Sequence, residues 1–130
     1  MELLFRALAD RTRLRLLNLM SGQEVCVCYF IEILGLPQST ISRHLAYMRR
    51  AGLVQAHREG KWMHYRLATH KQQAVQGILR EVLNSFQSDR EMERDRARLT
   101  RACCTPQKFV RLERAPLPTT APSMTGAQRN

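Results

Sequence analysis

The sequence predicts a mainly α-helical protein with one β-hairpin, the arrangement of a winged helix-turn-helix. Three observations predict this fold class. Apolar residues recur at helical spacing in the N-terminal part of the chain, the breaker run Gly35-Leu36-Pro37 interrupts them, and two extended runs flank the charged tip Arg58-Glu59-Gly60-Lys61. A chain of 130 residues has room for one small domain with a thin core, so a homodimer is expected.

The N-terminal segment is expected to form three helices. Glu2–Leu8 is apolar on one side. Asp10 precedes Arg11–Met20 as an N-cap, because its carboxylate can accept hydrogen bonds from the unpaired amides of a first helical turn. Gln23–Leu34 carries apolar residues at positions i, i+4 and i+7, so it is predicted to be a third helix that stops at Gly35.

A fourth helix is predicted from Gln38 to Arg50, closed by Gly52. At about 100° per residue, its aliphatic side chains fall on one stripe, which consists of Ile41, Leu45 and Met48. The opposite stripe carries small and basic side chains, namely Ser39, Ser42, Arg43, Ala46 and Arg50. Hydroxyls beside guanidinium groups suit a helix that enters the major groove of DNA and touches base edges and phosphates.

A β-hairpin is predicted directly after this helix. Leu53–His57 and Trp62–Leu67 are short extended runs, and the tip between them is basic and contains a glycine. A hairpin in this position is a wing, which lies along the DNA backbone or minor groove. The side chains expected to contact DNA are Gln38, Ser39, Thr40, Ser42, Arg43, His44, Arg58 and Lys61.

A further helix is predicted from Lys71. Ser88-x-x-Glu91 resembles a capping box, so a fresh helical start is expected near Ser88, and Arg90–Arg101 is expected to be a solvated helix. The apolar stripe of the Lys71 helix and that of the first helix have no further domain to pack on. A homodimer is therefore expected to form through Phe5, Leu8, Val75, Ile78, Val82 and Phe86.

The chain is expected to divide near residue 102. Residues 1–102 would form the DNA-binding and dimerisation domain, and residues 103–130 would hold the Cys103-Cys104 pair and a tail. Thr105–Asn130 contains four of the five prolines and few large apolar groups, so this tail is predicted to be disordered.

The net charge of +10 and the isoelectric point near 10.5 favour an anionic partner such as double-stranded DNA. The sequence shows neither a long apolar span nor a signal-peptide pattern, so a cytoplasmic location without membrane contact is expected. In such a reducing compartment, the four cysteines are expected to be thiols or metal ligands rather than disulfides.

Four motifs in order resemble the ArsR/SmtB family of metal- and metalloid-responsive repressors: LADRTRLRLLNLM at 8–20, EVCVC at 24–28, LGLPQSTISRHLAYMRRAGLV at 34–54 and REGKWMHYRL at 58–67. The resemblance covers about two-thirds of the chain, and EVCVC is similar to the arsenic- and antimony-responsive branch. It implies a homodimer that binds operator DNA and releases it when a thiophilic ion binds the thiols.

The chain departs from this family in three places. Relatives usually place an acidic residue after the second cysteine, where this chain has Tyr29. Some relatives supply a third cysteine where this chain has Ile31. An Asp-x-His pair is missing from the start of the last helix and His70 stands alone, so a zinc site of the last-helix type is not expected.

The resemblance implies that Cys26 and Cys28 bind the metalloid. Cys103 and Cys104 are further candidates, which could complete a three-sulfur site, form a site of their own or have no role. Trivalent arsenic is soft and prefers thiolates, so As(III) or Sb(III) is the expected inducer and no resident cofactor is required. Residues two apart on a helix point about 200° from each other. Chelation is therefore expected to distort the start of the third helix, which would release the DNA.

Other interpretations stay open at this point. The cysteines could be small buried apolar residues, or a redox sensor in the same fold could oxidise them to a disulfide. A small thiol oxidoreductase is a weaker alternative, because no thioredoxin-like βαβ pattern surrounds Cys26 and Cys28. An architectural DNA-binding protein without a ligand is the fourth possibility. The sequence has neither a nucleophile–base pairing nor a phosphate loop, so an enzyme is not expected.

Overall fold

The computed structural model describes residues 1–104 and 116–120, with side chains in 1–102 and 116–118. The elements follow in the order α1 (Glu2–Leu8), α2 (Arg11–Leu19), β1 (Gln23–Cys26), α3 (Val27–Leu34), α4 (Gln38–Arg50), β2 (Val54–Glu59), β3 (Trp62–Leu67), α5 (Gln73–Ser85), the 3-10 turn η1 (Phe86–Ser88), α6 (Arg90–Cys104) and β4 (Thr119–Thr120). The predicted fold class, mainly α-helical with a β-hairpin wing, is confirmed.

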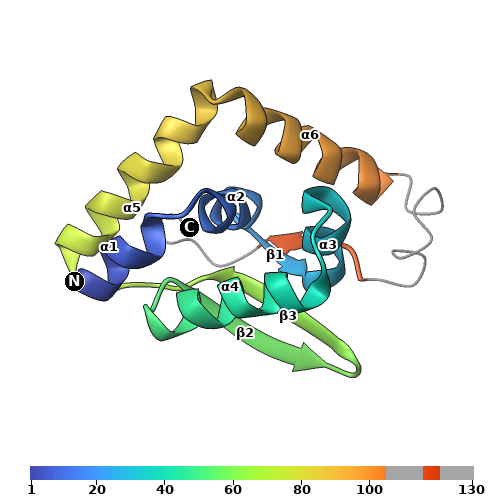
Figure 1. Ribbon diagram of the computed structural model, residues 1–130, viewed down its shortest axis with the longest axis horizontal. Helices are drawn as coiled ribbons and strands as arrows, with labels where there is room; N and C mark the ends of the chain where they lie inside the picture. Colours follow the sequence, from blue (N-terminus) through green and yellow to red (C-terminus); the bar gives the residue numbers. More distant parts are fainter. Residues whose placement is uncertain (105–115, 121–130) are drawn as a thin grey trace.

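The helices form an arch over a small sheet (Figure 1). α5 rises from the side of α1, and α6 descends toward α3 on the other side, with α2 beneath the arch. α4 and the hairpin β2–β3 lie at the opposite edge of the molecule. The strands are antiparallel in the order β2-β3-β1-β4, so the hairpin is joined to the core through β1.

The predicted core stripe of α4 is confirmed. Ile41, Leu45 and Met48 are fully buried, and they join one continuous core that includes residues of α2 and α3. The predicted N-cap is also confirmed, because the Asp10 carboxylate accepts a hydrogen bond of 3.0 Å from the backbone amide of Arg13. α4 is therefore a packed element, and its outer face is fixed relative to the rest of the domain.

The prediction of one helix over Gln23–Leu34 is wrong for its first four residues. Gln23–Cys26 is strand β1, which pairs with β3 so that Val25 lies opposite Tyr65 and Cys26 opposite His64. α3 begins only at Val27. The apolar helical spacing also begins at Val27. The four residues before it are extended because they pair with β3, which is distant along the chain.

The second hairpin strand has the predicted bounds, Trp62–Leu67, whereas the first is Val54–Glu59 in place of the predicted Leu53–His57. β2 reaches Glu59 and β3 begins at Trp62, so the turn consists of Gly60 and Lys61. Gly60 adopts φ +63°, a conformation that glycine takes at no steric cost. Arg58 therefore lies on the last part of a strand and Lys61 in the turn itself.

The predicted break near Ser88 is confirmed, but the cap is Asp89. Its carboxylate accepts a hydrogen bond of 3.1 Å from the backbone amide of Met92 and starts α6. The prediction that this helix is merely solvated is wrong, because Met92, Asp95, Leu99 and Ala102 are buried. α6 packs against α2 and α3 through these side chains.

Part of the predicted disordered tail has structure. Thr119 and Thr120 form β4, which pairs with Glu24 and Gln23 at the free edge of β1. The prediction of disorder is therefore wrong for this segment, and the rest of the tail lies outside the described residues. α6 extends to Cys104, so the predicted boundary at residue 102 falls inside a helix.

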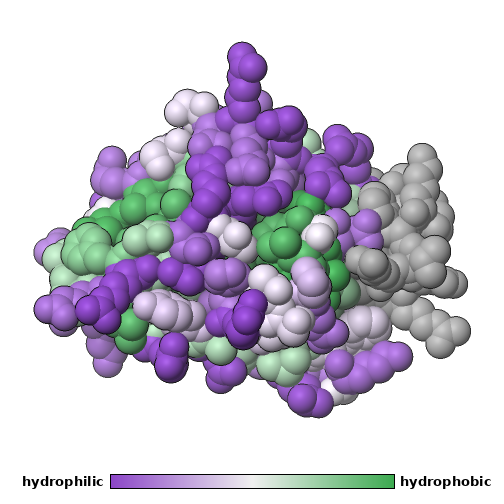
Figure 2. Space-filling model, viewed as in Figure 1, coloured by the Kyte–Doolittle hydropathy of each residue, from purple (hydrophilic) through white to green (hydrophobic). Residues whose placement is uncertain are grey.

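The face proposed for dimerisation is partly used within the single chain. Val75 and Phe86 are buried, whereas Phe5 keeps 52% of its surface exposed. Figure 2 shows an apolar area over α1 and α5 and a second one over α3. In the part of the chain that the structure describes, no helix is both long enough and apolar enough to cross a membrane.

Candidate DNA interface and thiol site

The outer face of α4 presents polar side chains to solvent. Gln38, Ser39, Ser42 and Arg43 are exposed, and Thr40 is half-buried. The buried stripe on the other side of the helix fixes which way these groups point. Amide, hydroxyl and guanidinium groups are of the kinds that contact base edges and phosphates in a major groove, and the contact of this face with DNA stays a prediction.

His44 has different surroundings from the other predicted DNA-contacting residues. It is half-buried, its Nδ1 lies 3.3 Å from the Arg13 guanidinium, and burial lowers the pKa of its imidazole. Arg13 also donates to the Ala7 carbonyl at 2.8 Å. His44 thus lies at the junction of α1, α2 and α4, and its DNA contact stays a prediction.

The two basic residues predicted in the wing are exposed to solvent. Arg58 and Lys61 are exposed, and the Lys61 ammonium lies 5.2 Å from the centre of the Trp62 ring. The base of the wing is held by the His57 ring, which stacks on His64 at 5.0 Å and places Nδ1 3.0 Å from the Glu24 carboxylate. The basic tip is therefore supported by contacts to β1.

Cys26 and Cys28 point toward each other. The Cys28 thiol donates a hydrogen bond to the Cys26 sulfur across 3.2 Å. The prediction that the two side chains diverge by about 200° is wrong, because Cys26 is not helical: it ends β1 with φ −70° and ψ 143°, and only Cys28 lies in the first turn of α3. Chelation therefore does not require the helix to be distorted first.

The thiols of Cys26 and Cys28 differ in pKa. The hydrogen bond from the Cys28 thiol lowers the pKa of Cys26, and the backbone amides at the start of α3 act in the same direction against the effect of burial. The same hydrogen bond, together with burial and the nearby charge of Cys26, raises the pKa of Cys28. Cys26 is thus the first thiolate of the pair and the better nucleophile near neutral pH.

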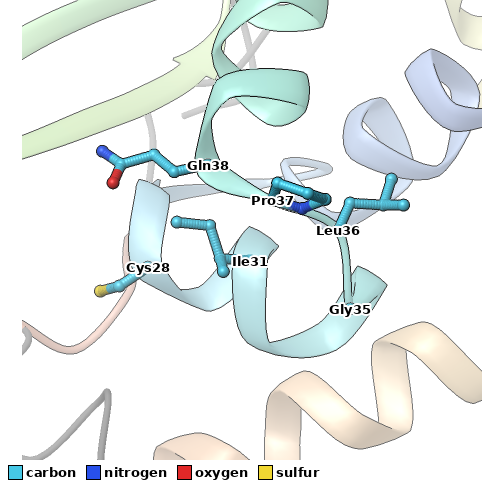
Figure 3. A pocket seen from close by; sticks show the side chains of 6 residues that line it. All are labelled: Cys28, Ile31, Gly35, Leu36, Pro37 and Gln38. Carbon is cyan, nitrogen blue, oxygen red and sulfur yellow. The ribbon is translucent and has the colours of Figure 1, made fainter.

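An open hollow of about 620 Å³ adjoins this pair (Figure 3). It is lined by residues of α3, the turn and the start of α4, namely Cys28, Ile31, Gly35, Leu36, Pro37 and Gln38. In Figure 3 the Cys28 sulfur and the Gln38 amide lie on the same side, with Ile31 between them. A ligand on the thiols would therefore touch the segment that sets the position of α4.

Comparison with known proteins assigns the chain to a family. Residues 10–56, from the cap of α2 into β2, match the model of the bacterial regulatory protein arsR family. The arsenic resistance transcriptional regulator ArsR1 of Pseudomonas putida is 41% identical over 86 residues, which cover 65% of this chain and 67% of that protein. The chain belongs to the ArsR family.

Two further relatives support this assignment. The arsenical resistance operon repressor of Escherichia coli is 48% identical over 68 residues, which cover 52% of this chain and 58% of the repressor. The structure of HlyU from Vibrio cholerae matches with a TM-score of 0.59 at 29% identity, over 67% of this chain and 91% of HlyU. This ArsR-family protein is a DNA-binding transcriptional regulator, and its relatives are regulators rather than enzymes.

The sequence did not identify the role of Tyr47 in this ArsR-family protein. The Arg13 guanidinium lies 4.4 Å from the centre of its ring, and that of Arg50 lies 5.3 Å from it. Tyr47 therefore orients Arg50 at the end of the DNA-facing helix. The spacing of three residues between Tyr47 and Arg50 is the signal that could have found this pair.

The end of α3 is held by α6. The Arg98 guanidinium donates to the Ile33 carbonyl at 2.5 Å and to the Glu32 carbonyl at 3.3 Å, where a helix has unpaired carbonyl groups. α3 is thus bounded by the thiol pair at one end and by Arg98 near the other. This contact could not be predicted from local patterns, because Arg98 is far from α3 along the chain.

Cys103 and Cys104 lie at the end of α6, and their side chains are outside the described residues. Their predicted part in the site is therefore untested. Among the described side chains, no three of His, Cys, Asp or Glu gather closely enough to hold a metal ion. The structure brings together two of the four predicted sulfur ligands.

Proposed function

We propose that this ArsR-family regulator represses transcription by binding operator DNA as a homodimer, and that As(III) or Sb(III) releases it by binding cysteine thiolates. The observation that carries this proposal is the 3.2 Å separation of the Cys26 and Cys28 sulfurs beside a hollow that reaches the start of α4. The names of the Pseudomonas and Escherichia relatives, both regulators of arsenic resistance, support the choice of ligand.

The sulfur geometry fits chelation of one atom. Two thiolates that bind one atom at ~2.3 Å, the Zn–S distance, would lie about 3.3 Å apart at roughly a right angle, the angle expected at pyramidal trivalent arsenic, and about 3.8 Å apart at the tetrahedral angle of zinc. The Cys26 and Cys28 sulfurs are already at 3.2 Å, so a thiophilic atom could take the place of the shared proton with little movement. Deprotonation of Cys26 provides the first thiolate, and bond formation displaces the proton of Cys28.

DNA contact is assigned to α4 and the wing. We propose that α4 enters the major groove with Gln38, Ser39, Thr40, Ser42, Arg43 and His44, while Arg58 and Lys61 contact phosphates. The exposure of most of these side chains and the fixed orientation of α4 support this assignment. The net charge of +10 provides the general attraction to the DNA backbone.

Dimerisation is proposed to use α1 and α5. Phe5 on α1 is exposed, and Ile78 and Val82 on α5 are half-buried. Figure 2 shows an apolar area over these two helices. Val75 and Phe86 would support this face from inside the chain. A second copy would cover a surface that is otherwise apolar and in water.

Release follows from the short path between ligand and DNA. A ligand on Cys28 occupies the hollow against the turn Gly35-Leu36-Pro37, which leads directly into α4. A thousandfold weakening of operator binding requires the ligand to favour the DNA-free conformation by only ~4 kcal/mol. Thiolate-rich metal sites provide ~10–16 kcal/mol in peptides, so the ligand can supply that preference.

Cys103 and Cys104, at the end of α6, are proposed to complete the coordination. Trivalent arsenic takes up to three thiolates, and the described side chains provide two. The pairing of β4 with β1 supports a tail that returns to the strand that ends at Cys26.

A second candidate is a redox sensor, which the same sulfur distance favours. Hydrogen peroxide would oxidise the two thiols to a disulfide and be reduced to two molecules of water, with the two thiol protons entering the water. The test is operator release measured by fluorescence anisotropy with arsenite and, separately, with peroxide. Release by arsenite under a non-thiol reductant supports the metalloid sensor, and release by peroxide alone would replace it with the redox sensor.

A further inference from the structure

We propose that His44 binds an operator phosphate as a neutral hydrogen-bond donor, and that Arg13 is the positioning residue that fixes its ring in this form. This inference rests on the proposed function, because it requires that α4 binds DNA. The feature that carries it is the contact between the Arg13 guanidinium and the His44 ring, where α1, α2 and α4 pack against one another.

The Arg13 guanidinium is held both at its edge and on its face. Its Nε donates to the Ala7 carbonyl at 2.8 Å, and Nη2 donates to the Arg6 carbonyl at 3.0 Å, near the end of α1. Its central carbon lies 4.4 Å from the centre of the Tyr47 ring of α4, and the side chain is only 13% exposed. The remaining nitrogen, Nη1, is therefore fixed in the direction of His44.

This contact determines which nitrogen of the His44 ring carries the proton. Nη1 of Arg13 lies 3.3 Å from Nδ1 of His44. A guanidinium has only N–H donors and keeps its charge in proteins, so Nδ1 must be the acceptor. In a neutral imidazole whose Nδ1 accepts, the proton is on Nε2. Arg13 thus selects the tautomer whose N–H lies on the side of the ring away from the guanidinium.

The same contact disfavours the protonated ring. An imidazolium has no acceptor nitrogen, so protonation of His44 would break the hydrogen bond and place two cations side by side. Burial lowers the pKa of His44, and the charges of Arg13 and Arg43 act in the same direction against that of Asp10. His44 is therefore expected to be neutral near neutral pH, with one N–H to donate.

The N–H of Nε2 is available at the edge of the outer face of α4. Among the described residues, Nε2 of His44 has no hydrogen-bond partner, and it is not buried. His44 follows the exposed Arg43 by one residue, which is about 100° around the helix. Side chains at the edge of a helix in the major groove lie nearest to the phosphates, whose oxygens accept hydrogen bonds. A neutral N–H donor fits such an oxygen.

The salt dependence of binding tests the neutral donor on the full-length protein. Affinity for an operator duplex selected from a random library is measured by fluorescence anisotropy at several salt concentrations. His44→Asn keeps an oxygen near the position of Nδ1 but has no donor at the position of Nε2. It should weaken binding about tenfold, which corresponds to ~1.4 kcal/mol. The salt slope should stay unchanged, because a neutral donor replaces no counterion.

His44→Gln is the matched variant. Its longer side chain can place an amide N–H near the position of Nε2, so its affinity should stay within about threefold of the wild type. The order of the two variants shows on which side the ring acts. Loss in Gln with retention in Asn would assign His44 to the contact with Arg13 alone and overturn the inference.

A second matched pair tests the positioning role of Arg13. Arg13→Lys keeps the charge but loses the planar fork, so operator binding should weaken about fivefold. Arg11→Lys makes the same change on the same helix, where Arg11 contacts Asp89 and Glu91 of the α6 region, and should leave affinity unchanged. The loss in Arg13→Lys should disappear in a His44→Asn background, because a positioning residue acts through the residue it holds. A purely structural role would weaken both backgrounds equally.

The tautomer can be measured without DNA. Nitrogen NMR shifts of the histidine rings in the free protein should show the Nε2–H tautomer for His44, and a mixture of tautomers in Arg13→Lys. An Nδ1–H tautomer or an imidazolium near neutral pH in the wild type would overturn the inference.

The outcomes distinguish the inference from the proposed function. A wild-type protein that selects and binds no duplex overturns both. Operator binding whose salt slope falls by about one counterion in His44→Asn overturns the inference alone, because His44 would then bind as a cation. Equal losses in Arg13→Lys and Arg11→Lys also overturn the inference and leave the proposed function standing.

Discussion

At the scale of single residues, the thiol pair depends on one hydrogen bond. The Cys28 thiol donates to Cys26, which favours the thiolate of Cys26 and disfavours that of Cys28. A thiolate is the form that bonds to arsenic, so this hydrogen bond prepares one sulfur for attack and keeps the second one beside it.

This arrangement predicts two separate titration steps. In a Cys103→Ser/Cys104→Ser background, the thiolate absorbance of the pair should rise first below the pH at which an ordinary cysteine ionises, and again well above it. The sign follows from the lowered pKa of Cys26 and the raised pKa of Cys28. Cys28→Ala removes the donor, so the remaining step should move to higher pH. A single step at the same pH in both proteins would contradict the assigned hydrogen bond.

At the scale of elements, the inner and outer faces of α4 have separate roles. Its inner face is part of the core, and its outer face and the wing expose the side chains that we propose contact DNA. Substitutions on the outer face should therefore change DNA affinity without changing the free energy of unfolding.

Two substitutions test how the DNA-contacting groups divide their roles. Arg43→Ala should cost ~1–3 kcal/mol of operator binding and relax specificity, because a guanidinium in the major groove reads a base edge. Lys61→Ala should weaken all DNA sequences alike and reduce the salt dependence by about one counterion. Anisotropy titrations at several salt concentrations measure both effects. Unchanged specificity in Arg43→Ala would remove that residue from base recognition.

α6 is held to α2 by an ion pair that is largely buried. The Arg15 guanidinium donates to both oxygens of Asp95 at 2.7 and 3.0 Å, and the Asp95 side chain is 3% exposed. Asp95→Ala should lower the free energy of unfolding by about 3 kcal/mol, because Arg15 would lose both short hydrogen bonds and keep only Glu91, whose carboxylate is 3.7 Å away. Urea denaturation measures this loss. Glu93→Ala, at an exposed position of the same helix, is the control and should change it by less than ~0.5 kcal/mol.

The sequence predicted the elements that depend on local pattern. The stripe of α4, the Asp10 cap and the hairpin could be found because spacing, cap chemistry and turn residues act over a few positions. The strand character of Gln23–Cys26 could not be found, because it depends on pairing with Trp62–Leu67. The two thiols point toward each other because Cys26 belongs to that strand. The sequence therefore identified both thiols but predicted the wrong relative orientation for them.

At the scale of the whole molecule, the described chain leaves an apolar face over α1 and α5 in water. Met1, just before α1, and Leu3 and Phe5 of α1 are exposed, and the apolar area continues over α5. Soluble proteins seldom leave such a patch uncovered. The homodimer would cover this patch and place two copies of α4 on one operator.

Sedimentation tests the homodimer with a matched pair of variants. Phe5→Glu should shift the protein from dimer to monomer at micromolar concentration, because a charge would be buried in the interface. Leu117 has nearly the same exposure, 53% against 52%, but lies outside α1 and α5, so Leu117→Glu should leave the dimer intact. Equal behaviour of the two variants would move the interface elsewhere.

The central claim is that Cys26 and Cys28 form the arsenic site that controls release of DNA. Arsenite-driven release from the operator, measured in Cys26→Ser, Cys28→Ser and Cys103→Ser/Cys104→Ser, tests it most directly. The two single variants should bind DNA as the wild type does and fail to release it, since a serine hydroxyl is a hard and poor ligand. The double variant should still release, at a higher arsenite concentration if the tail supplies a third sulfur. Release by Cys26→Ser together with failure of the double variant would place the sensor in the tail and contradict the account.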